Sequence, residues 1–169
     1  NLRDSKIDVV VGLPSTRSRK RARKDRFESL SVPRAVDAAD IIALLCPDQK
    51  HKEVFENDIK PNLREGQVLM FAHALSIHFV LIKPPEGLDI IMAAPHAPGV
   101  LMRERFKEGK GVTAFMAIHT DTSGNARNIA LAYSKAIGCT RSGVFETTFE
   151  HEAVGDIFGE QIALCGGLT

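Results

Sequence analysis

Cysteine is scarce in this chain of 169 residues, which has three copies at Cys46, Cys139 and Cys165. No two of them form a CxxC pair, which excludes a zinc ribbon and a disulfide framework. Long hydrophobic runs are also missing, because stretches such as Ile41–Cys46 and Val68–Ala72 are far too short to cross a bilayer. No signal peptide opens the sequence. These absences favour a protein of a reducing compartment.

An excess of one charge is missing as well, since the formal net charge is +1. The distribution is uneven, because residues 17–26 hold seven Lys or Arg and one Asp, a local charge of +6. The rest of the chain has 15 basic and 20 acidic residues and is mildly acidic. A basic run is most often a solvated helix face, and it can also be a nucleic-acid patch. No aromatic side chains interleave with this run, so nucleic-acid binding ranks last among the functions considered.

Short apolar runs recur along the chain and alternate with segments of helical character. The runs that predict buried strands are Ile7–Val11, Ile41–Cys46, Val68–Ala72, Leu88–Ala93 and Val112–Ile118. The segments that predict helices are Arg17–Leu30, Gln49–Ile59, Gly99–Phe106 and Ala126–Ile137. For the last of these, Ser123 is a candidate N-cap and Gly138 a candidate end. Strands that alternate with helices predict an α/β fold with a doubly wound parallel sheet.

The two ends of the sequence differ from the rest. The chain begins Asn-Leu-Arg-Asp-Ser without an initiator Met, and a helical run follows Thr147 with no strand after it. We therefore expect a segment of a longer protein. Residues 1–146 would form one nucleotide-binding domain, and residues 147–169 would begin another domain.

Three sets of residues could carry chemistry. In a doubly wound fold, the segment after the second strand lies beside the adenosine ribose, where Arg and Ser/Thr accommodate a 2′-phosphate. Thr16, Arg17 and Ser18 occupy that position, with no carboxylate before Asp25, which predicts NADP rather than NAD. The alternative for this run is the solvated helix face described above.

The second set is the acidic pair Asp156 and Glu160, whose i, i+4 spacing places both carboxylates on one helix face. Two hard oxygen ligands suit Mg²⁺, although exposed acidic pairs on helices are common. The third set is His73 and His96, each of which follows a predicted strand, where ligands bind in open α/β sheets. For each histidine alone, a surface or core role is the commoner one.

Together these segments resemble ketol-acid reductoisomerase (acetohydroxy-acid isomeroreductase), in its short class I form, along almost the whole chain. The matching segments are Asn1–Ser5, Asp8–Leu13, Pro47–Asp48, Ile59–Leu63, Phe71–His73, Ile77–Phe79, Ile82–Pro85, Ala94–Gly99, Gly124–Asn125, Ala130–Tyr133, Glu146–Phe149, Asp156–Gln161 and Leu164–Gly167.

The resemblance implies a Rossmann-like NADP-binding domain whose first strand and Gly-rich loop precede Asn1, followed by the first helix of an all-α knotted domain. It implies Mg²⁺-dependent alkyl migration in 2-acetolactate or 2-aceto-2-hydroxybutyrate, then NADPH reduction to the 2,3-dihydroxy acid of valine and isoleucine biosynthesis. The implied roles are catalytic for His73 and His96, cofactor-binding for Thr16, Arg17, Ser18, Asp48, Gln49 and Ala74, and metal-binding for Asp156 and Glu160. The implied setting is a homo-oligomer in the bacterial cytoplasm or a eukaryotic organelle, with neither membrane nor nucleic acid as partner.

Three departures from the family pattern are visible. The chain is one residue shorter before Pro14, where the family has an Arg that Arg17 or Arg19 would have to replace. His96 stands where the family has a Lys, and Ala74 where it has a Gly after the active-site histidine. These departures keep open a second hypothesis, a diverged or truncated remnant without catalysis. The 169 residues alone are expected to be inactive under either hypothesis, because further metal carboxylates belong to the all-α domain.

Overall fold

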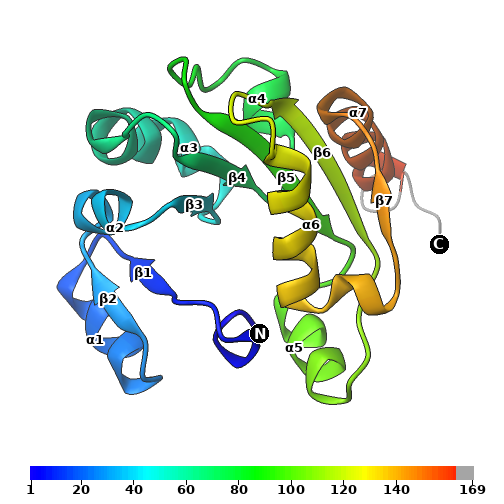
Figure 1. Ribbon diagram of the computed structural model, residues 1–169, viewed down its shortest axis with the longest axis horizontal. Helices are drawn as coiled ribbons and strands as arrows, with labels where there is room; N and C mark the ends of the chain where they lie inside the picture. The colour runs from blue at the N-terminus through cyan, green and yellow to red at the C-terminus, as the bar shows by residue number, and fades with distance from the viewer. Residues whose placement is uncertain (163–169) are drawn as a thin grey trace.

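The computed structural model describes residues 1–162, in which seven strands form two sheets. A pair of strands, in the order β1-β2, makes the first sheet, and the second has the order β3-β4-β5-β6-β7 (Figure 1). The strands are β1 (Val10–Gly12), β2 (Glu28–Leu30), β3 (Ile41–Leu44), β4 (Val68–Phe71), β5 (Asp89–Pro95), β6 (Ala114–Thr120) and β7 (Val144–Glu146).

Helices connect most of these strands. They are α1 (Thr16–Lys24), α2 (Val32–Ala38), α3 (Asp48–Val54), α4 (Leu75–His78), α5 (Gly99–Lys107), α6 (Ala126–Ile137) and α7 (Phe149–Glu160). The shorter turns are η1 (Arg3–Ser5), the π-helical η2 (Phe55–Ile59), η3 (Lys60–Asn62) and η4 (Cys139–Arg141). None of the helices among residues 1–162 is both long and apolar enough to cross a membrane.

The predicted α/β class is confirmed, and the sheets are parallel except for one pair of strands. β5 and β6 run antiparallel, with Pro95 opposite Ala114. β5 ends and β6 begins at the same edge of the sheet, so the segment that contains α5 returns there without crossing the sheet. The apolar pattern of β6 could not predict this direction, because a strand buried on both faces has the same pattern in either orientation.

The strand order has a break between β1 and β3. Strand β1 pairs with β2, and β3 pairs with β4, so each of β1 and β3 has one edge without a partner among the described strands. In the usual doubly wound order 3-2-1-4-5-6, this break falls at the position of strand 1.

Two local predictions were wrong. The helix expected over Arg17–Leu30 ends at Lys24, because Arg26 takes a left-handed conformation with φ 61° and the chain then enters β2. The N-cap position of α6 is Asn125, whereas Ser123 donates its hydroxyl to the buried carboxylate of Asp89 at 2.6 Å. The predicted end of α6 at Gly138 is confirmed, with φ 97°.

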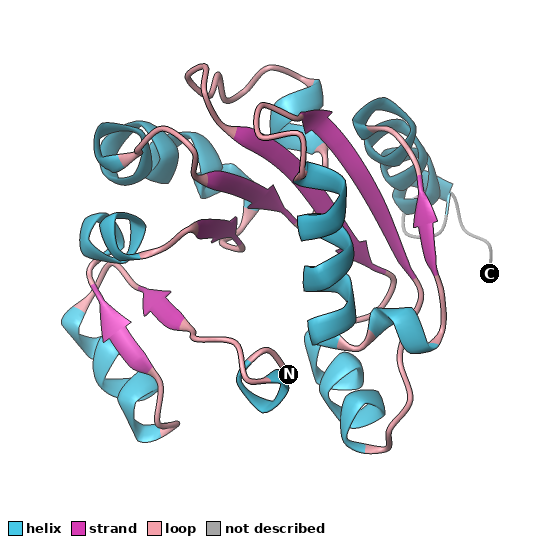
Figure 2. Cartoon of the chain, viewed as in Figure 1, coloured by secondary structure: helices cyan, strands magenta, loops and turns pink. Residues whose placement is uncertain are grey.

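The core is built on both faces of β4 and β5, which are almost entirely buried. On one face, Met70 and Ile91 pack with α6, which lies across the front of the central strands (Figure 2). On the other face, Phe71 packs in the core cluster that also contains Phe149 and Ala153 of α7. Helix α7 therefore packs on the Phe71 face of the sheet, where Ala74 and Ile77, which follow β4, also pack.

Candidate functional site

The strongest polar cluster of the described chain forms where β4 ends. The strand is apolar through Phe71, and the next residues to carry polar groups into the site are His73 and the backbone of Ala74. His73 is partly buried, with 22% of its side chain exposed. Ala74 is fully buried and has ordinary right-handed dihedrals (φ −84°, ψ −11°). Alanine is therefore unstrained where the family has a glycine, although its Cβ adds bulk there.

Glu152 of α7 holds this turn. Its Oε2 accepts a hydrogen bond from the Ala74 backbone N–H at 2.8 Å and lies 3.2 Å from Nδ1 of His73. The Glu152 side chain is only 7% exposed. Because a carboxylate only accepts, Nδ1 of His73 carries the proton of this bond. This arrangement turns Nε2 of His73 away from Glu152 and leaves it available for chemistry.

Two further carboxylates approach the Nε2 atom of His73. Oδ2 of Asp156 lies 3.5 Å from it, and Oδ2 of Asp48 lies 3.8 Å from it. The hydrogen bond with Glu152 raises the pKa of His73 above its ordinary value, against the opposing effect of burial, and the charges of all three carboxylates add to the rise. The site therefore favours a protonated imidazole surrounded by negative charge.

Sequence reasoning missed Glu152, although a signal was present. Glu152, Asp156 and Glu160 are spaced four residues apart and form one stripe along α7. The pair Asp156 and Glu160 was predicted from this spacing, and extending it one turn toward the N-terminus reaches Glu152. Glu160 is the last residue of α7, and its side chain lies outside the described part of the structure.

The predicted ribose-end residues lie on the first turn of α1, directly after β1. The Ser15 hydroxyl caps the helix by accepting from the Ser18 backbone N–H at 3.0 Å. Arg19 folds back to donate to the Leu13 carbonyl at 2.9 Å and to Oγ1 of Thr16 at 3.1 Å. The Arg19 guanidinium thus stabilises the turn. The Arg17 side chain is exposed and makes no hydrogen bond or ion pair with a described residue, so it is the freer of the two candidate arginines.

Among the described residues, no hydrogen bond or ion pair joins His96 to the His73 cluster. His96 follows β5 and is exposed, with Nδ1 at 3.2 Å from Oγ1 of Thr113. Its ring packs edge-on against Phe115, with 4.3 Å between the ring centroids. The predicted pair Asp48 and Gln49 opens α3, where Gln49 is exposed. Thr16, His73 and His96 thus each follow the carboxyl end of a strand, as predicted, and Asp48 follows β3 in the same way.

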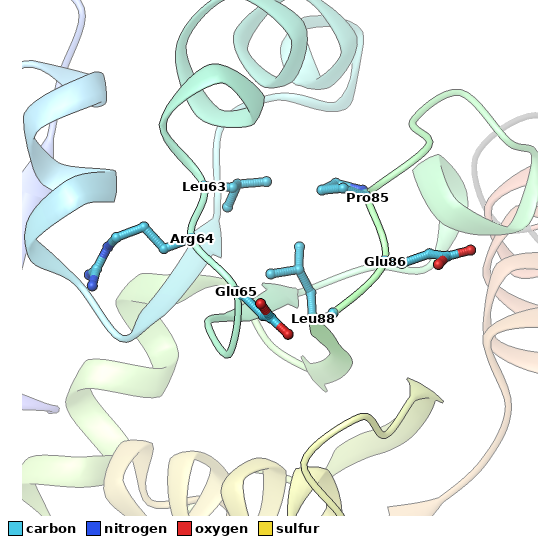
Figure 3. Close-up of a pocket in the computed structure, with 7 residues that line it drawn as sticks. Leu63, Arg64, Glu65, Pro85, Glu86 and Leu88 are labelled. Atoms are coloured by element: carbon cyan, nitrogen blue, oxygen red, sulfur yellow. The ribbon is translucent and has the colours of Figure 1, made fainter.

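An open hollow lies at the amino ends of β4 and β5, opposite the carboxyl ends where the predicted site residues lie (Figure 3). It is lined by Leu63 and Glu65, which precede β4, and by Pro85 and Leu88, which precede β5. Arg64 points away from the hollow in Figure 3 and donates to the Asp37 carbonyl at 2.8 Å. Because the hollow is at the amino ends of the strands, it contains none of the predicted site residues.

The strand order and the polar residues at the carboxyl ends of the strands define a Rossmann-like nucleotide-binding domain. Residues 1–143 match the sequence model of the NADPH-binding domain of acetohydroxy acid isomeroreductase. The chain also superimposes on an NADH-preferring ketol-acid reductoisomerase from an uncultured archaeon with a TM-score of 0.94 and 43% sequence identity. That match covers 99% of this chain and 52% of the other. The chain belongs to the ketol-acid reductoisomerase family.

More distant structures share the fold alone. A semialdehyde dehydrogenase NAD-binding protein from Cupriavidus necator matches with a TM-score of 0.71 at 20% identity, covering 90% of this chain and 58% of the other. A 3-hydroxyisobutyrate dehydrogenase from Salmonella typhimurium matches with a TM-score of 0.61 at 11% identity, covering 96% and 56%. The chain therefore spans about half the length of the ketol-acid reductoisomerase that it resembles.

Proposed function

We propose that the full-length protein containing this chain is a ketol-acid reductoisomerase. It would convert 2-acetolactate or 2-aceto-2-hydroxybutyrate into the 2,3-dihydroxy acid, by Mg²⁺-dependent alkyl migration followed by reduction with NADPH. This would place it in valine and isoleucine biosynthesis. The observation that carries the proposal is the cluster at the end of β4, where Glu152, Asp156 and Asp48 surround His73.

In this proposal His73 moves or holds a proton at Nε2. Glu152 fixes the ring through Nδ1, so that Nε2 faces the open side of the cluster. A protonated His73 would donate a hydrogen bond to a substrate oxygen, and a neutral one would accept a proton at the same atom. His96 would contribute a second imidazole from the neighbouring strand end, oriented by Thr113 and Phe115.

The donor set of α7 fits a hard dication. Carboxylate oxygens are the ligands that Mg²⁺ prefers, and Asp156 presents its carboxylate at the surface of the cluster, with 45% of the side chain exposed. Among the described residues, no group of three or more His, Cys, Asp or Glu is arranged to hold a metal. Asp156 and Glu160 would therefore supply part of the coordination. A bound Mg²⁺ would polarise the substrate ketone and stabilise the alkoxide that forms during migration.

The metal assignment is tested with Asp156→Asn in the full-length protein. We expect isomerisation to be abolished, while NADPH binds with nearly normal affinity, because the amide keeps the shape of the carboxylate and loses its charge. Direct reduction of a substrate that needs no alkyl shift should fall less than isomerisation. Glu150→Gln, an exposed change on the same helix, is the control. If Asp156→Asn isomerises its substrate at the unmodified rate at an ordinary Mg²⁺ concentration, Asp156 is not a metal ligand and belongs to a solvated helix face.

The cofactor assignment depends on the first turn of α1. Thr16, Arg17 and Ser18 offer hydroxyls and a cation with no carboxylate, which suits a 2′-phosphate and supports NADPH. The matched archaeal enzyme is described as NADH-preferring. Cofactor choice therefore has to be tested on this chain's own residues.

Ser18→Asp should invert the preference by repelling the 2′-phosphate, as measured by titrating NADPH and NADH separately. Ser15 and Thr16 remain in place, and Ser18→Ala separates the loss of the hydroxyl from the added charge. Equal affinity for the two cofactors before mutation would contradict the NADPH assignment. Asp48, Gln49 and Ala74 are proposed to lie along the same cofactor. We also propose a homo-oligomeric, cytoplasmic or organellar enzyme.

A further inference from the structure

A buried histidine with no part in the proposed chemistry connects two loops of the site. His51 lies on α3, one turn after Asp48, and is 4% exposed. Its Nε2 is 2.9 Å from the Cys46 carbonyl, and its Nδ1 is 2.8 Å from the Ser76 hydroxyl of α4. A carbonyl only accepts, so Nε2 carries a proton, and Ser76 can donate to Nδ1 when the ring is neutral. Both ring nitrogens are thus engaged.

His51 also touches the carboxylate that faces the active-site imidazole. Its Nε2 is 3.4 Å from Oδ1 of Asp48, while Oδ2 of the same carboxylate is 3.8 Å from Nε2 of His73. The Asp48 side chain is 38% exposed. Asp48 is the first residue of α3, and the preceding N-cap residue, Pro47, makes no side-chain hydrogen bond to the helix. His51 is therefore a buried partner on the inner side of a partly exposed carboxylate.

The partners of His51 come from both sides of the site. Cys46 and Asp48 belong to the turn after β3, and Ser76 belongs to the first turn of α4, directly after His73 and Ala74. Ser76 is itself 1% exposed. The His51 side chain thus connects the Asp48 turn to the His73 turn, because its hydrogen bonds to both fix their relative position. A histidine with only a structural role in the core needs a polar partner for each ring nitrogen, but those partners need not come from two loops of the site.

We propose that His51 is a positioning residue that acts through Asp48: it holds the Cys46–Asp48 turn against α4 so that the Asp48 carboxylate faces the site of the cofactor and His73. The inference rests on the proposed function, since it assigns His51 a place in the same site. Removing His51 would free the Asp48 turn, and we expect the loss to appear in turnover and cofactor affinity chiefly through Asp48.

The test is a double-mutant cycle between His51→Gln and Asp48→Asn in the full-length protein, with 2-acetolactate as substrate and NADPH as cofactor. We expect His51→Gln to lower kcat/KM by about tenfold in the unmodified background and by less than about twofold in the Asp48→Asn background, which corresponds to a coupling of about 1 kcal/mol. The melting temperature is measured on all four proteins, so that a loss of activity can be separated from a loss of stability.

Asp89→Asn is the matched control for a buried polar loss. Asp89 is 3% exposed and accepts from Thr122 and Ser123 at the amino end of β5, away from the site. It should lower the melting temperature and leave kcat/KM unchanged at 25 °C. His51→Asn adds a second test, because its shorter amide cannot span from Cys46 to Ser76 and should not restore activity better than glutamine.

Each outcome decides between the proposals. If Asp48→Asn changes neither kcat/KM nor NADPH affinity, the assignment of Asp48 to the cofactor site fails. If Asp48→Asn has an effect but His51→Gln lowers kcat/KM equally in both backgrounds, or not at all, the positioning role is overturned and His51 is a structural core residue. A drop in kcat/KM that Asp89→Asn reproduces would overturn it as well.

Discussion

Replacing Glu152 by Gln tests the contact that joins α7 to the turn of His73 and Ala74. The change keeps the size of the side chain but leaves one amide oxygen for two donors, the Ala74 N–H and Nδ1 of His73. The amide nitrogen then faces one of these donors and cannot accept from it. Hydrogen bonds to a charged group contribute about 1.5–3 kcal/mol each, and the site is buried. We expect Glu152→Gln to lower the free energy of unfolding by about 2–3 kcal/mol at pH 6.

The loss should depend on pH with a definite sign. Glu152 raises the pKa of His73 in the folded state above the unfolded value of about 6.5. The resulting stabilisation is fully present below pH 6.5 and disappears as the pH rises through the folded-state pKa. The difference between the unmodified protein and Glu152→Gln should therefore be largest near pH 6 and smaller at pH 9, where the bond to the Ala74 N–H remains.

Thermal unfolding at a series of pH values measures this difference. For a domain of this size, 2–3 kcal/mol corresponds to a fall in Tm of about 4–12 °C. An NMR titration of His73 should show a lower pKa in the variant. Glu150→Gln is the control, since Glu150 is exposed on the same helix and has no described hydrogen bond. Equal melting curves for the two variants, or a loss that grows with pH, would refute the reasoning.

Two further predictions concern the backbone. Val80 is 56% exposed with φ 55°, a conformation that strains a β-branched residue, so Val80→Gly should raise the free energy of unfolding by about 0.5–1 kcal/mol. Leu81→Gly, its exposed neighbour with ordinary φ, should lower it, and a loss in both variants would remove strain as the explanation. Gly111→Ala should lower stability by about 1–3 kcal/mol, because its Cβ would collide with the Gly138 carbonyl oxygen. Gly155→Ala, in α7 with open space around it, should raise stability by about 0.5–1 kcal/mol, and chemical denaturation of the pair should give opposite signs.

The sequence alone predicted the α/β class, five of the seven strands and the end of α6. This was possible because continuous apolar runs and helical spacing are local properties of the chain. It missed β2 and β7, which have three residues each and include a glutamate, so that neither forms a continuous apolar run. It also placed the N-cap of α6 at Ser123, because the demand of the buried Asp89 carboxylate for donors is a tertiary property.

For the site, the sequence alone predicted the residues whose type, spacing or position after a strand indicates a functional role: His73, Asp156 and the first turn of α1. Only the tertiary structure showed that Asp156 and Asp48 approach the same atom of His73. It alone revealed Glu152, since a glutamate on an amphipathic helix is usually solvated and only packing buried this one against the Ala74 N–H. It likewise gave His51 its two partners, which lie five and 25 residues away along the chain. Spacing within one helix is fixed by the sequence, whereas proximity between loops depends on the order in which the strands pair in the sheet.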